Sequence, residues 1–119
     1  MNSPWIKIGI IVLMLVAEAL AIGSEVWAAK LYSQQQGLVR VLIKTAPIVI
    51  AGGFALILAY IWGYQVFQNI WIVAVLSITA ILIMEPIIAY SIFKEMPTTG
   101  AIIGFILGIL GFFSSIYIK

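Results

Sequence analysis

The chain has 119 residues, of which 65% are hydrophobic and only 8% are charged, with a formal net charge of +2. Soluble domains carry about a quarter charged residues, so this composition excludes a soluble domain and predicts an integral membrane protein. The sequence contains no cysteine and no histidine, which removes disulfides and the commonest ligands of transition metals. We therefore expect no metal, no other cofactor and no enzyme activity, and nucleic acid is an improbable partner for so few basic residues.

The first apolar segment covers residues 5–29 and contains two glutamates, Glu18 and Glu25. It has no small-residue cleavage pattern, so we expect a retained transmembrane helix and not a leader peptide. A carboxylate near the centre of a bilayer costs roughly 2.5 to 3.5 kcal/mol. The two glutamates are seven residues apart, nearly two helical turns, and so share one helix face. This face is predicted to line the interior of the protein.

A carboxyl group inside a membrane can exchange a proton or pair with a cation, as proton-coupled transport requires. Glu18 and Glu25 are therefore candidate proton-binding and substrate-binding residues. Glu25 also has a structural interpretation, because it lies about one turn before Lys30. At that position it could be solvated at the membrane surface or joined to a lysine in a salt bridge.

A polar loop at residues 32–37 separates the first span from the second, which is predicted at residues 39–62. An uncharged connector at residues 63–69 leads to the third span, predicted at residues 70–93. Trp71 begins this span and belongs either to an interfacial aromatic belt or to an interior wall that stacks on a substrate. Within the span, Glu85 precedes Pro86, which cannot donate a backbone hydrogen bond. This pair predicts a hinge beside a binding carboxylate, or a structural kink with Glu85 bonded to a neighbouring helix.

The fourth span is predicted at residues 100–118, after a connector at residues 94–99 in which Pro97 suits a turn. Glycines recur at four-residue spacing along it, a pattern that lets two helices approach closely, and the last one continues the stripe: Gly100, Gly104, Gly108 and Gly111. The partner helix could belong to the same chain or to a second copy. The sequence thus predicts an all-α protein with a single four-helix transmembrane domain over residues 1–119.

Four spans place both chain ends on one side of the membrane. Basic residues flank the first and third connectors in slight excess over the terminal side: Lys30, Arg40, Lys44 and Lys94 against Lys7 and Lys119. This excess predicts cytoplasmic first and third loops and outward-facing termini. The compact size favours a prokaryotic plasma (inner) membrane.

The C-terminal part resembles the drug/metabolite transporter superfamily in its Glu-Pro helix, its acidic turn and its glycine-rich last helix: Glu85-Pro86, residues 93–95 and residues 101–111. Residues 23–30 are similar to the end of the first helix in EamA-type members. The four-span length, Ala17-Glu18, Ile70-Trp71 and the seven-residue spacing of Gly104 and Gly111 resemble the small multidrug resistance branch of the superfamily.

This resemblance implies a homodimeric antiporter that exports cationic or other small hydrophobic compounds by alternating access. Glu18 would bind the proton or the substrate, Glu25 and Glu85 would be supporting polar groups, and Trp71 would be a stacking wall. One alternative is a subunit of a lipid-linked sugar flippase, which shares the fold and pairs with a homologous chain. Another is a non-transporting subunit that packs against a larger complex.

Overall fold

The computed structural model describes residues 4–118, which form four helices joined by three short connectors. The helices are α1 (Pro4–Ser33), α2 (Leu38–Phe67), α3 (Ile70–Phe93) and α4 (Thr99–Tyr117). This confirms the predicted all-α architecture. Three helices, α1 to α3, are long and apolar enough to cross a membrane. The fourth has 19 residues, or about 28 Å of helix, slightly less than the roughly 30 Å hydrocarbon core of a bilayer.

The bounds of α3 agree with the sequence prediction, whereas α1 and α2 continue four and five residues beyond the predicted ends at 29 and 62. The extension of α1 runs into the polar stretch through Ser33, whose hydroxyl donates to the carbonyl oxygen of Lys30. The extension of α2 begins at Gly63, for which the sequence pattern predicts a place in the connector. Gly63 is instead a buried residue that packs against Val73 of α3. The connector between α2 and α3 is therefore only Gln68 and Asn69.

Backbone geometry at the helix ends explains why the connectors are short. Gln68 and Lys94 both adopt the left-handed conformation, with φ of 56° and 59°, and their N–H groups close the ends of α2 and α3. Such a residue ends a helix by pairing one of its last carbonyls. At the opposite ends, the side chain of Asn69 accepts from the N–H of Trp71, and the hydroxyl oxygen of Thr98 accepts from that of Ala101. These caps pair N–H groups that have no partner within the helix.

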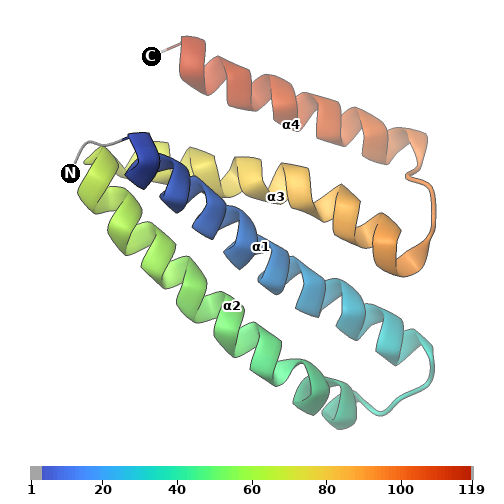
Figure 1. The fold of residues 1–119 in the computed structure, drawn as a ribbon. Helices are drawn as coiled ribbons and strands as arrows, with labels where there is room; N and C mark the ends of the chain where they lie inside the picture. The colour runs from blue at the N-terminus through green and yellow to red at the C-terminus, as the bar shows by residue number, and fades with distance from the viewer. Residues whose placement is uncertain (1–3, 119) are drawn as a thin grey trace.

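Helix α1 lies between α2 and α3 and packs against both, while α4 lies beside α3 (Figure 1). Phe112 of α4 also lines a small cavity together with Ile11, Met14 and Leu15 of α1. The core between the first three helices contains Met14, Ala59, Val73 and Ala80. Large apolar side chains cover the outer surface of all four helices, as lipid contact requires.

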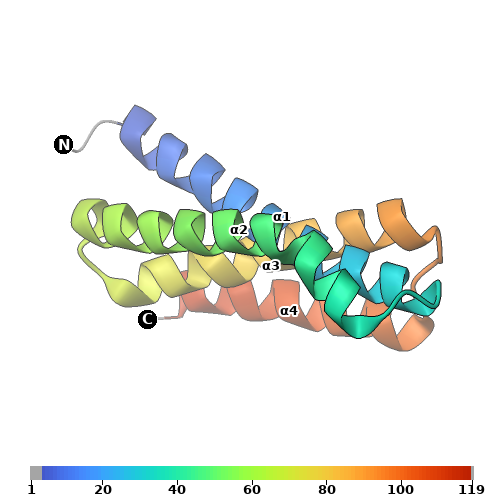
Figure 2. The same ribbon diagram turned by 90° about the horizontal axis from the view of Figure 1, so that it is seen from below.

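A small residue sets the distance between α1 and α2. A Cβ atom added to Gly52 would lie 3.1 Å from both the backbone nitrogen of Ala21 and the Cβ of Leu20. The two backbones are thus in near contact, as small residues permit in membrane helix pairs. Helix α2 also contains Pro47, and Figure 2 shows that its first turns bend away from the remainder. A proline removes one backbone hydrogen bond and commonly bends a helix in this way.

Candidate functional site

Glu18 lies in the interior of the bundle, as the sequence predicted, with 6% of its surface exposed. The hydroxyl of Ser77 on α3 donates a 3.0 Å hydrogen bond to its Oε1 atom. The position follows from the buried stripe of α1, where Met14, Ala17, Glu18 and Ile22 recur at helical spacing. Ser77 belongs to the corresponding stripe of α3 with Val73 and Ala80. The contact between α1 and α3 therefore presents one donor to one carboxylate.

Glu25 shares the helix face of Glu18 but is exposed. Seven residues at 100° each rotate the side chain to within about 20° of the same direction, so the rotation does not explain the difference. Helices α2 and α3 meet at the connector between them and diverge toward the far end of α1 (Figure 1). The prediction that this whole face lines an interior is correct at Glu18 and wrong at Glu25, although Ser24 and Leu31 on other faces of the same part of α1 are buried.

Glu85 is half-buried on α3, eight residues after Ser77. Glu25 lies seven residues after Glu18 on α1, and Glu85 lies on α3, the helix whose Ser77 bonds Glu18. We call these three residues the acidic cluster. Its members range from Glu18 inside the bundle to Glu25 at the surface, and a proton or an organic cation would neutralise each carboxylate. Within residues 4–118, no group of acidic residues has an arrangement that could hold a metal ion.

The ammonium group of Lys30 lies at the far end of α1. Its Nζ atom donates a 2.7 Å hydrogen bond to the carbonyl oxygen of Ile92, in the last turn of α3. One interpretation of Glu25 was a salt bridge to Lys30. The ammonium group of Lys30 instead bonds a backbone carbonyl of α3. Pro86 follows Glu85 within α3, and the helix continues beyond it to Phe93. The role of Pro86 as a hinge stays a prediction.

Trp71 lies in the first turn of α3 and is 77% exposed. The prediction that its ring faces the interior is wrong for a single chain, and its position near the connector agrees with the aromatic-belt interpretation. A role in stacking on a substrate would require a surface supplied by another chain.

The glycines of α4 divide into two groups. A Cβ added to Gly108 would lie 2.8 Å from Cδ2 of Leu82 on α3, so this glycine is at the contact within the chain. The other three, Gly100, Gly104 and Gly111, have nothing within 4 Å of an added Cβ. They form an open glycine edge beside the contact with α3, and this edge remains available to another helix.

Sequence reasoning did not identify Ser77 as part of the site. A signal was present, since Ser77 lies four residues after Val73 and three before Ala80, on one helix face of a strongly apolar span. A hydroxyl on such a face needs a partner, and a buried glutamate on another helix is a suitable one.

Comparisons of the chain with protein-family models, with curated proteins and with solved structures found no match. Any assignment of function therefore depends on the residues and their arrangement.

Proposed function

We propose that the chain is a small secondary transporter of a prokaryotic inner membrane, a proton antiporter that exports cationic or other small hydrophobic compounds. The observation that carries this proposal is the buried carboxylate of Glu18, held by a hydrogen bond from Ser77 across the α1–α3 contact. A carboxyl group inside a membrane protein is costly, and such groups mark the paths of ions and substrates. The resemblance to the drug/metabolite transporter superfamily supports the same function.

The mechanism uses one carboxylate for two alternative ligands. A proton on Glu18 excludes a cationic substrate, and a cationic substrate excludes the proton, so competition couples the two fluxes in alternating access. Ser77 keeps the carboxylate oriented in its hydrogen bond. Glu25 is exposed on the same helix face, so it is the first member of the acidic cluster to meet a cation that arrives from the end where α2 and α3 diverge.

A second copy of the chain completes the transporter. Helices α1 to α3 leave Glu25 exposed, and α4 packs mainly against α3. A homodimer would cover these surfaces, provide the second structural repeat that a central site requires and place Trp71 against a partner helix. In this arrangement α4 crosses the membrane as the fourth span, and the first and third loops lie in the cytoplasm.

The test measures proton release from purified protein when a hydrophobic cation such as tetraphenylphosphonium, or a guanidinium compound, is added. We expect release from the unchanged protein and none from Glu18→Gln, because glutamine still accepts from Ser77 but cannot release a proton. Glu95→Gln is the matched control, since Glu95 is an exposed carboxylate in the connector after α3, and it should release protons normally. Undiminished release from Glu18→Gln would show that the assignment of Glu18 is wrong.

The exposed Glu25 and the open glycine edge also favour a second candidate, a membrane subunit that pairs with a different chain. In a lipid-linked sugar flippase the partner chain would be homologous to this protein. In a larger complex the partner would be unrelated. Purification separates these functions from the transporter. A monodisperse homodimer in detergent supports the antiporter, whereas a chain that is stable only with another protein supports the subunit.

A further inference from the structure

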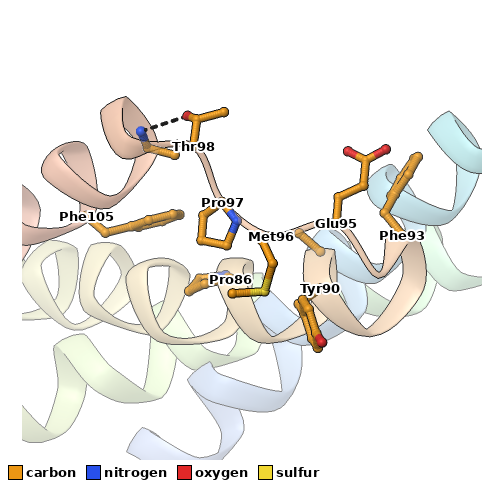
Figure 3. A pocket seen from close by; sticks show the side chains of 10 residues that line it. Pro86, Tyr90, Phe93, Glu95, Met96, Pro97, Thr98 and Phe105 are labelled. Carbon is orange, nitrogen blue, oxygen red and sulfur yellow. Dashed lines mark hydrogen bonds between the residues drawn. The ribbon is translucent and has the colours of Figure 1, made fainter.

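A cleft of about 380 Å³ lies between α3 and α4 at the end joined by the third connector (Figure 3). Its walls come from the last two turns of α3, from the connector and from the first two turns of α4. The helices touch where Gly108 meets Leu82, and the cleft occupies the space between that contact and the connector. Its volume lies in the range of about 300 to 1,000 Å³ that is typical of small-molecule sites.

The inner part of the cleft is apolar. Pro86 and Ala89 of α3, Pro97 of the connector and Ala101 and Phe105 of α4 contribute most of this lining. From Pro86 to the end of α3 at Phe93 is about 10 Å along the helix axis. Because α3 is a membrane-crossing helix, the cleft extends from headgroup level into the hydrocarbon layer, where an acyl chain could enter.

The lining of the cleft includes one charged side chain. Glu95 is the charged residue among the ten that line it, and it is exposed. Lys94 precedes it in the chain but does not line the cleft, and its Nζ atom lies 5.7 Å from the ring centroid of Tyr90. One carboxylate therefore lies beside an apolar channel at the depth of the lipid headgroups.

We propose that this cleft binds a phospholipid with a zwitterionic, amine-bearing headgroup, of which phosphatidylethanolamine is the simplest example. One acyl chain occupies the apolar channel, and the headgroup ammonium pairs with the carboxylate of Glu95. Charge complementarity selects this occupant, because an anionic headgroup such as phosphatidylglycerol would leave Glu95 without a cation. This site is separate from the acidic cluster and does not depend on the transport function.

The test uses the full-length protein, stripped of lipid in a mild detergent and titrated with phosphatidylethanolamine or phosphatidylglycerol, with native mass spectrometry to measure retained lipid. We expect phosphatidylethanolamine to bind about tenfold more tightly. Glu95→Gln should reduce this preference to about one, whereas Glu25→Gln, which removes an exposed carboxylate elsewhere, should not change it. Ala101→Trp fills the channel and should reduce retention of both lipids, whereas Ala51→Trp, at an exposed alanine of α2, should not.

Three outcomes would overturn the proposal. An unchanged lipid preference in Glu95→Gln would contradict amine recognition. Equal retention by Ala101→Trp and Ala51→Trp, repeated with Ala89→Phe on the opposite wall, would contradict binding in the cleft. Displacement of phosphatidylethanolamine from the unchanged protein by an equal concentration of tetraphenylphosphonium would identify the occupant as a hydrophobic cation instead.

Discussion

Lys30 and Ile92 join the end of α1 to the end of α3, through a 2.7 Å hydrogen bond from Nζ to the carbonyl oxygen. The last carbonyls of a helix have no partner within it and carry the negative end of the helix dipole. An ammonium group at this position therefore satisfies a hydrogen bond and offsets the dipole at once. The two helices that carry the acidic cluster are connected at this point.

Lys30→Met should lower the free energy of unfolding by about 1 to 2 kcal/mol, because a part-buried bond from a charged donor is lost. Thermal unfolding in detergent, followed by circular dichroism, measures the effect. Lys44→Met is the matched control, since Lys44 bonds the side chain of Gln36 at an exposed position and should lose less than about 0.5 kcal/mol. Equal losses in the two variants would contradict a structural role for Lys30.

Ser77→Ala should destabilise the protein by about 1 to 3 kcal/mol, because it leaves a buried oxygen of Glu18 without its donor. Ser91→Ala also removes a serine hydroxyl from α3, but one that is exposed and bonded within its own helix, so its loss should be small. Urea unfolding curves of both variants in detergent give the comparison. A Ser77→Ala protein as stable as Ser91→Ala would show that the Glu18 bond contributes little.

Gly52→Ala should destabilise the protein by about 1 to 3 kcal/mol, the usual cost of overpacking, because the new methyl group would press on Leu20 and the backbone of Ala21. Gly53→Ala is the adjacent control. An added Cβ there meets nothing within 4 Å, and alanine favours the helix by up to about 1 kcal/mol, so stability should stay the same or rise. Melting temperatures of the two variants test the close contact between α1 and α2. An unchanged melting temperature in Gly52→Ala would contradict this contact.

Gly104→Leu tests the proposed homodimer without disturbing the single chain. The added side chain meets no atom of its own chain at Cβ, so helicity should be unchanged, while the dimer dissociation constant should rise more than tenfold as the open glycine edge is blocked. Sedimentation equilibrium in detergent measures this constant. Gly9→Leu, at another glycine with open surroundings, should leave association unchanged. If Gly104→Leu associates normally, the glycine edge is not the dimer contact.

Long apolar runs made the four helices predictable from the sequence, because a bilayer demands them. The positions at which the helices end were harder to predict from the sequence. The sequence pattern predicts a connector at Gly63 and the amides after it, yet Gly63 belongs to α2 and packs against Val73 of α3. A glycine that permits close packing and a glycine that permits a turn have the same local sequence, and tertiary contact decides between them.

The candidate site was also predictable only in part. The interior position of Glu18 was predictable, since a carboxylate avoids lipid. Its pairing with Ser77 depends on how α1 and α3 are aligned along their contact, which no pattern within one helix specifies. The exposure of Glu25, next to the buried Ser24, depends on how three helices pack together.

The two-residue connector between α2 and α3 limits how the protein can move. Gln68 closes the end of α2 in a left-handed conformation, and Asn69 caps the start of α3 immediately afterwards. Gly63 packs on Val73 beside this turn, so α2 and α3 are held together at the connector. At the opposite end of α3, the bond from Lys30 of α1 to Ile92 would have to break before the ends of α1 and α3 could separate.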